Sequence, residues 1–159
     1  MVLLLLATLL SATLEVRVVS VHDGDTVTVL VGTEQVKVRL AEIDAPELKQ
    51  PFGAKVKQAL SSKVFNKSVR VESTGKDRYG RTLGTVYLGE ENVNLWMVKE
   101  GWAWRYDRYS KSDILKRAQE EAKKERKGLW SDERAVEPWE WRKAKTKHPT
   151  SPLTPEFHP

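Results

Sequence analysis

Residues 23–47 read DGDTVTVLVGTEQVKVRLAEIDAPE, a stretch that combines strand-like runs with short charged turns. It contains two runs rich in β-branched residues, 26–31 and 35–40, separated by a turn that contains Gly32. In the second run apolar and polar residues alternate, as in a strand with one buried face. Together with an alternating run at 15–21, the stretch predicts a three-stranded antiparallel meander with short turns.

The first turn of this meander contains HDGD, residues 22–25. A glycine between two aspartates predicts a tight turn, with Gly24 free to adopt a positive φ. Because aspartate-glycine sequences are common in ordinary turns, this motif alone does not establish a metal site.

The same stretch supplies four candidate site carboxylates and one guanidinium: Asp23, Asp25, Arg39, Asp44 and Glu47. Carboxylate oxygens are the ligands that hard divalent cations prefer. Arg39 alternates with the apolar residues of its strand, so its side chain is predicted to lie outside the core, where it can meet a bound anion. Arg81, in the later polar turn KDRYGR, can supply a second guanidinium to a phosphate.

Each of these residues also has an ordinary structural interpretation. Glu47 follows a proline and can begin a helix, since glutamate favours a first turn. The two arginines can be unrelated surface residues. In the aromatic and basic segment 102–109, at least one tryptophan is predicted to be a core residue, while Tyr106 and Tyr109 are predicted to be exposed, where they can stack on bases.

Beyond the meander, the hydrophobic pattern changes its period several times. Apolar residues at helical spacing predict an amphipathic helix over residues 52–66. Alternating runs at 68–73 and 82–88 predict two more strands. The second of these contains Gly84, which is typical of a bulge or a barrel corner.

Two further helices are predicted over residues 90–100 and 112–127, the second with Ser112 as its N-cap. Five strands, with one helix between the third and fourth and two helices after the fifth, match a partly open Greek-key barrel of the OB type. The predicted fold class is therefore α+β, mainly a five-stranded β barrel with three α-helices in the order βββ-α-ββ-α-α.

The two ends of the chain differ from its middle. Residues 1–13 are almost wholly apolar, but a helix of that length is too short to span about 30 Å of hydrocarbon. They predict a signal peptide and export to the periplasm or the medium, or alternatively a short membrane anchor. The folded domain is predicted over 14–131. In 132–159, Trp139 and Trp141 are expected to pack on this domain, and the proline-rich remainder is predicted to be disordered.

Composition limits the possible chemistry. A chain of 159 residues is expected to form one domain, and its net charge of +5 favours a polyanionic partner such as nucleic acid. Without cysteine it has neither disulfides nor a thiol nucleophile. Two of its three histidines, His148 and His158, lie in the tail, so no zinc site built from histidines is expected.

The motifs DGDT, VRL, IDAPE and YGR, followed by GLW after a basic helix, resemble the staphylococcal (micrococcal) nuclease family, also called thermonucleases. The resemblance covers residues 15–131 and implies an OB-fold barrel with three helices, which agrees with the predicted order of elements. It also implies a calcium-dependent endonuclease that hydrolyses both DNA and RNA. In that reaction water attacks phosphorus in line, the calcium ion polarises the phosphate, and the products carry a 3′-phosphate.

By the same resemblance, Asp25 and Asp44 are the direct ligands of one calcium ion. The backbone carbonyl of Ala45 is a further ligand, and Asp23 lies beside the site without touching the ion. The family pattern thus combines side-chain and backbone oxygens in one cation site.

The resemblance also implies roles for the remaining residues of the site. Arg39 and Arg81 contact the phosphate, and Glu47 is the general base. The implied nucleotide-binding residues are Tyr79, Leu83 and Tyr109. DNA and RNA are the expected partners of a monomer that has no stable protein partner and, in its mature form, no membrane association.

The alternative is a catalytically inactive OB-fold module that binds nucleic acid or protein. The two interpretations differ in what they require of five residues, all of which are present: Asp25, Arg39, Asp44, Glu47 and Arg81. A module that only binds has no physical reason to keep all five, so the sequence favours the enzyme.

Overall fold

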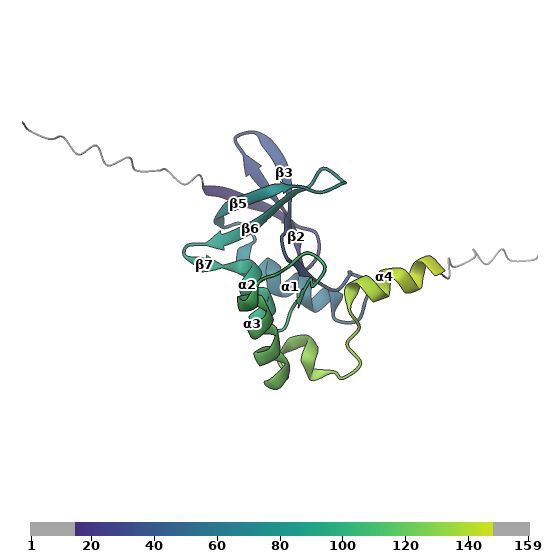
Figure 1. Cartoon of the computed structure of the whole chain (residues 1–159). Coiled ribbons are helices and arrows are strands. Elements are labelled where there is room, and N and C mark those ends of the chain that lie inside the picture. Colours follow the sequence, from purple (N-terminus) through teal and green to yellow (C-terminus); the bar gives the residue numbers. More distant parts are fainter. Residues whose placement is uncertain (1–14, 148–159) are drawn as a thin grey trace, which may run out of the picture.

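The computed structural model describes residues 15–147 (Figure 1). The predicted signal peptide, residues 1–13, lies outside the described residues, as does the tail from residue 148 onward. Among residues 15–147, no helix combines the length and the apolar character that a membrane crossing requires.

Five strands form the barrel, and neighbouring strands pair in the order β3-β2-β1-β5-β6. These strands are β1 (Glu15–Val21), β2 (Thr26–Val31), β3 (Glu34–Leu40), β5 (Ser68–Lys76) and β6 (Thr82–Leu88). Consecutive neighbours are antiparallel, and a parallel pairing of β3 with β6 joins the two ends of this order. The predicted five-stranded α+β barrel is thus confirmed, and the β3–β6 pairing closes it where a partly open barrel was expected.

The bulge predicted at Gly84 also lies where the barrel closes. The register of β5 against β6 shifts between Ser73 and Gly75, opposite Gly84, while Gly84 pairs with Leu40 on the other side. A Cβ at Gly84 would lie 2.9 Å from the backbone oxygen of Glu72. Only glycine allows the two strands to approach this closely at the corner of the barrel.

The remaining elements cover the lower part of the barrel (Figure 1). They are β4 (Ile43–Asp44), α1 (Gly53–Val64), β7 (Glu91–Asn92), α2 (Val93–Lys99), β8 (Trp104–Arg105), α3 (Asp113–Lys124), the 3-10 turn η1 (Gly128–Ser131) and α4 (Pro138–Lys147). Strand β4 pairs with β8 in a separate two-stranded sheet, and β7 extends β6. The N-cap predicted for α3 is present, because Ser112 Oγ accepts the backbone N–H of Leu115 at 3.2 Å.

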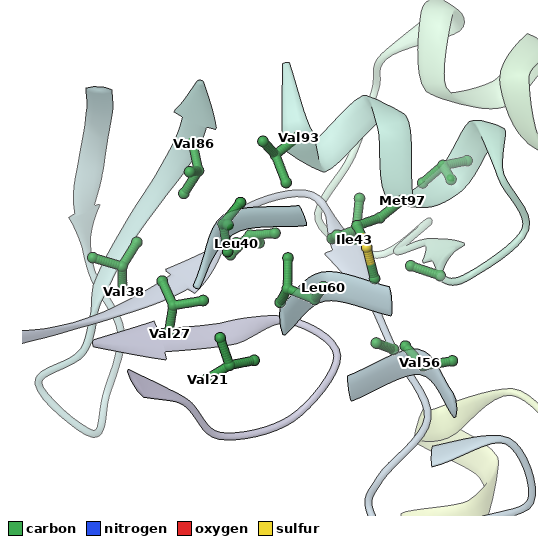
Figure 2. Packing of buried hydrophobic residues seen from close by; sticks show 14 of the residues in the cluster. Val21, Val27, Val38, Leu40, Ile43, Val56, Leu60, Val86, Val93 and Met97 are labelled. Atoms are coloured by element: carbon green, nitrogen blue, oxygen red, sulfur yellow. The ribbon is translucent and has the colours of Figure 1, made fainter. Parts of the chain in front are cut away.

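Helix α1 closes one end of the barrel core. Its apolar stripe places Val56 and Leu60 fully inside the protein. Figure 2 shows both residues facing the same cluster as Leu40 and Ile43, with Met97 of α2 at its edge. The alternation predicted for β3 is confirmed, since Val38 and Leu40 are buried, Lys37 is exposed and Arg39 is partly exposed.

The C-terminal segment differs from the prediction of three helices and a disordered remainder. A fourth helix, α4, occupies residues 138–147, so residues 142–147, which fall in the predicted disordered remainder, are helical. Its first residue is Pro138, whose missing N–H is not needed in a first helical turn. The ring of Trp139 stacks on Tyr106 at 5.3 Å between centroids, so Tyr106 is partly covered and not exposed as predicted.

Gly24 has a different role from the one expected for it. It is not among the glycines with positive φ. A Cβ on Gly24 would instead lie 2.3 Å from Val56 Cγ1 and 2.7 Å from the Cβ of Ala45. The turn therefore needs glycine because helix α1 packs directly against its backbone.

We expect Gly24→Ala to destabilise the protein by about 1–3 kcal/mol, because the added methyl overlaps two packed side chains. Urea unfolding measures the loss. In the double variant Gly24→Ala, Val56→Ala the clash with α1 is relieved. Its loss of stability should therefore be smaller than the sum of the losses in the two single variants. Additive losses would contradict the proposed contact.

Candidate active site

Arg39 lies at the centre of the site. Its Nη1 donates to the backbone carbonyls of Leu40 at 2.6 Å and Ile43 at 2.9 Å. Its Nη2 donates to Asp44 Oδ1 at 3.0 Å and lies 3.1 Å from Asp25 Oδ2. One guanidinium from the outer face of β3 therefore joins two carboxylates that come from two different turns.

Backbone hydrogen bonds fix the position of Asp25. Its carbonyl accepts the N–H of Leu40 at 2.8 Å, and its Oδ2 accepts the N–H of Ala45 at 2.8 Å. Its own N–H donates to Asp23 Oδ1 at 3.0 Å, which places the Asp23 carboxylate beside that of Asp25. The peptide of Ala45 and the carboxylates of Asp23 and Asp25 thus form one cluster.

Asp44 is held in β4, whose pairing with Trp104 of β8 fixes its backbone. Its side chain is 1% exposed. Both of its oxygens are engaged by guanidinium groups, one from Arg39 and one from Arg142 of α4. A carboxylate this deeply buried requires such charged partners.

Burial shifts the pKa of both aspartates upward, in spite of their charged partners. Burial raises the pKa of Asp25 to about 6, an effect that Arg39 opposes and the nearby Asp23 reinforces. Burial also raises the pKa of Asp44, although Arg142 and Arg39 oppose the shift. Both carboxyl groups would ionise more readily beside an additional cation.

The donor set suits a hard divalent cation. Within residues 15–147, no three histidine, cysteine or acidic side chains are grouped as a complete metal site, and the two guanidinium groups lie between the carboxylates. Asp25 and Asp44 nevertheless offer carboxylate oxygens, and the Ala45 peptide meets the site through its N–H, which donates to Asp25 Oδ2. Calcium binds carboxylate oxygens and completes its shell with backbone carbonyls and water.

Glu47 lies on the loop between β4 and α1 and does not begin a helix. Its backbone N–H donates to Gln50 Oε1 at 3.2 Å, and the buried Gln50 also donates to the carbonyl of Val136 at 2.6 Å. The Glu47 side chain is 40% exposed, in contrast to the buried Asp44. Its carboxylate therefore lies at the rim of the site, where water can reach it.

Arg142 is the residue of this site that sequence reasoning missed. Its Nη2 donates to Asp44 Oδ2 at 2.7 Å, and its Nη1 donates to Glu47 Oε1 at 2.9 Å. Burial lowers its pKa, but the hydrogen bonds to Asp44 and Glu47 outweigh this effect and raise it. In the sequence, Trp139 and Arg142 of the PWEWR segment are three residues apart, which places them on one face if the segment is helical. This spacing does not indicate which residues Arg142 contacts.

Arg81 does not join this network. Its Nε donates to Asp77 Oδ2 at 2.7 Å within the turn that precedes β6. The next residue, Thr82, pairs with Val38 across the barrel closure, so the backbone of Arg81 lies near the strand that carries Arg39. The structure thus places Arg81 in the turn directly before the strand that pairs with β3, with its side chain bound within that turn.

The three residues predicted to bind the nucleotide lie in two places. Leu83 and Tyr79 lie near the barrel closure, and Tyr109 lies in the loop before α3. Leu83 of β6 pairs with Arg39. The ring of Tyr79 is 69% exposed and lies 5.5 Å from the Arg81 guanidinium. Tyr109 is 62% exposed and packs edge-on against Tyr106. Trp104, in contrast, is buried, as predicted for at least one tryptophan of this segment.

Comparison with known proteins identifies the family. A family model described as "Staphylococcal nuclease homologue" matches residues 37–132. The chain is also 51% identical over 146 residues to a protein of Haemophilus influenzae named "Uncharacterized endonuclease", and the match covers 89% of this chain and 82% of that protein. The chain belongs to the staphylococcal nuclease family.

Other relatives are nearly as similar. "Micrococcal nuclease" of Shigella flexneri is 45% identical over 139 residues, and the match covers 80% of this chain and 80% of that protein. "Protein ParB" of Escherichia coli is 47% identical over 144 residues, covering 83% of this chain and 81% of that protein. The family model ends at residue 132, so α4 and Arg142 lie beyond the part of the chain that the family model describes.

The raised pKa of Asp25 gives the cation-free protein a pH-dependent stability. Because its folded pKa is about 6 and its ordinary value is 3.8, the folded state binds more protons than the unfolded state between these values. We therefore expect the Asp25 contribution to the free energy of unfolding to fall as the pH rises from 4 to 6, by at most about 1.4 kcal/mol per pH unit. Urea unfolding in chelator at several pH values measures the slope.

Other groups titrate in the same range, so the contribution of Asp25 is obtained by difference. Asp25→Asn retains an acceptor for the N–H of Ala45 and cannot ionise. The stability of this variant, relative to the wild type, should rise as the pH increases from 4 to 6. A difference that does not change with pH would contradict the raised pKa.

Proposed function

We propose that this member of the staphylococcal nuclease family is a calcium-dependent endonuclease that cleaves DNA and RNA and leaves 3′-phosphate ends. Membership of the family makes the chain a nuclease, a hydrolase of phosphodiester bonds. The finer proposal is supported above all by one observation, the convergence of Asp25 and Asp44 on Arg39 with Glu47 at the rim. These groups match the needs of a reaction in which water displaces an alkoxide from an anionic phosphate.

Asp25 and Asp44 would hold the cation, together with the backbone carbonyl of Ala45. The calcium ion, when bound, would supply positive charge that polarises the phosphate and offsets the charge of the transition state. Asp23 would remain outside the ion and reinforce the negative potential at Asp25, as its effect on the pKa of Asp25 indicates.

Arg39 and Arg81 would bind the scissile phosphate. A guanidinium keeps its charge at any physiological pH and matches two phosphate oxygens with two parallel donors. Both arginines would have to exchange a present partner for the phosphate, since Arg39 Nη2 now binds Asp25 and Asp44 and Arg81 Nε binds Asp77. After such an exchange Arg39 would still be held by two backbone carbonyls, and Asp77 would keep the backbone N–H groups of Tyr79 and Arg81.

Glu47 would accept the proton of the attacking water, which approaches phosphorus in line while the 5′ oxygen leaves. Its carboxylate is exposed enough to meet water and is fixed by the Gln50 contact of its backbone. The exposed rings of Tyr79 and Tyr109, with Leu83, would line the nucleotide. Because the polar contacts go to phosphate, little preference between bases or between sugars is expected.

We further propose that the enzyme acts as a monomer outside the cytoplasm, after removal of residues 1–13. This proposal rests on the apolar N-terminal run. An intact, membrane-anchored N-terminus is the alternative that mass spectrometry of the mature protein would reveal.

The test is digestion of single-stranded DNA by the protein lacking residues 1–13, with calcium, with magnesium and with chelator. Cleavage that requires calcium and leaves 3′-phosphate ends would support the proposal. No cleavage with either metal, while DNA is still bound, would instead support an inactive binding module.

Glu47→Gln keeps the size of the side chain and an acceptor for Arg142 but cannot take a proton. We expect its kcat to fall by about 100- to 10,000-fold, with DNA binding retained. The matched control is Glu120→Gln, on the exposed face of α3, which should cleave at the wild-type rate. A Glu47→Gln variant as active as this control would remove Glu47 from the mechanism.

Arg39→Lys retains one positive charge, but an ammonium cannot bind two carbonyls and two carboxylates at once. We expect a loss of at least about 100-fold in kcat/KM, comparable to the loss of an oriented electrostatic donor. Urea unfolding of the same variant separates lost activity from lost folding. Wild-type turnover in the folded variant would exclude Arg39 from the phosphate site.

A further inference from the structure

The C-terminal helix α4 reaches the candidate cation site through one side chain. Arg142 Nη2 lies 2.7 Å from Asp44 Oδ2, and Nη1 lies 2.9 Å from Glu47 Oε1 and 3.3 Å from Asp44 Oδ1. Arg142 therefore binds the proposed cation ligand and the proposed general base together. Each of these contacts joins the segment that the family model matches to a helix outside it, because the match ends at residue 132 and α4 begins at Pro138.

Two anchors fix α4 so that Arg142 points at the carboxylates. Trp139 stacks on Tyr106 with an angle of 4° between the rings. The carbonyl of Val136, just before the helix, accepts the side-chain amide of Gln50, which also holds the Glu47 loop. Because Trp139 and Arg142 are three residues apart, they lie on one face of the helix. The placement of Arg142 is thus built into the packing of α4.

The charge balance of the site shows what Arg142 does there. All the contacts of Arg39 Nη1 go to backbone carbonyls, so only its Nη2 is left for Asp25 and Asp44. Arg142 supplies the other positive charge on Asp44, whose side chain is only 1% exposed. The negative charge on the Asp44 oxygen that faces Arg142 is therefore compensated by the Arg142 guanidinium of the same chain.

From these contacts we infer that Arg142 acts as an internal counter-cation, which occupies Asp44 and Glu47 and must leave Asp44 when the divalent ion binds. A guanidinium and a divalent ion on the same carboxylate oxygen would repel each other strongly. The Arg142 side chain is 40% exposed, so its guanidinium can move into water while the helix stays anchored. Arg142 thereby lowers the affinity of the site for the divalent cation. Helix α4, which holds Arg142 in place, thus sets the cation concentration at which the site is filled.

This inference rests on the proposed calcium site, and its test is calcium binding in the absence of nucleic acid, measured by isothermal titration calorimetry. We expect Arg142→Gln to bind calcium about tenfold more tightly than the wild type, because the competing charge is gone. Arg142→Lys, which can hold only one of the two carboxylates at a time, should fall between them.

The matched control is Lys143→Gln. Lys143 is the next residue of α4, carries the same charge, is 65% exposed and pairs with Glu140 of its own helix. This variant removes one positive charge without touching Asp44 or Glu47, so its calcium affinity should stay within about twofold of the wild type. An equal gain in both variants would indicate a general effect of net charge and overturn the specific role of Arg142.

A second readout is the thermal stability of each variant with and without calcium. Without calcium, Arg142→Gln should unfold at a lower temperature than the wild type, because Asp44 has lost a partner. The increase in Tm on adding calcium should be larger in this variant, as expected for tighter binding to the folded state. An unchanged or weaker calcium affinity in Arg142→Gln, with a folded protein, overturns the inference.

Failure of the inference and failure of the proposed function give different results. If the wild type cleaves DNA with calcium but Arg142→Gln gains no affinity, only the role of Arg142 is wrong. If the wild type neither binds calcium nor needs it for cleavage, the proposed calcium dependence is wrong as well.

Discussion

The contacts of the Arg39 guanidinium hold the candidate site together. This guanidinium joins Asp25 from the turn after β1 to Asp44 of β4, and it binds the carbonyls of Leu40 and Ile43 between them. Two buried carboxylates could not lie this close without a compensating charge, because each would take up a proton instead. The arginine therefore shapes the loop that carries Asp44 and also provides a group that can bind phosphate.

The barrel places this guanidinium by closing on itself. Parallel pairing of β3 with β6 brings the start of β6 beside Arg39, and Gly84 allows the close approach at the corner. Helix α1 then packs against Gly24, so the turn that carries Asp25 is pressed onto the core. A hydrophobic core of ordinary composition thus becomes a rigid support for charged groups at its edge.

The C-terminal helix adds a positive charge to a site that the barrel alone leaves negative. Arg142 neutralises Asp44 and Glu47 in the way that a cation would, without any change to the barrel itself. A site of this kind can be adjusted through a peripheral helix, because electrostatic contacts between side chains depend on position in space and not on the element that supplies them. The C-terminal segment is therefore part of the site and not only a surface covering.

From the sequence alone, the five barrel strands were predicted correctly, because alternation acts over a few residues. Short motifs also marked Asp25, Arg39, Asp44 and Glu47 as candidate site residues. The role of Gly24 was misjudged because its neighbour Val56 is brought to it only by the packing of α1. The contact of Arg142 with Asp44, a residue 98 positions earlier, is visible only in the folded structure. No local pattern specifies which distant partner a surface arginine meets, since that depends on how α4 packs against the folded domain.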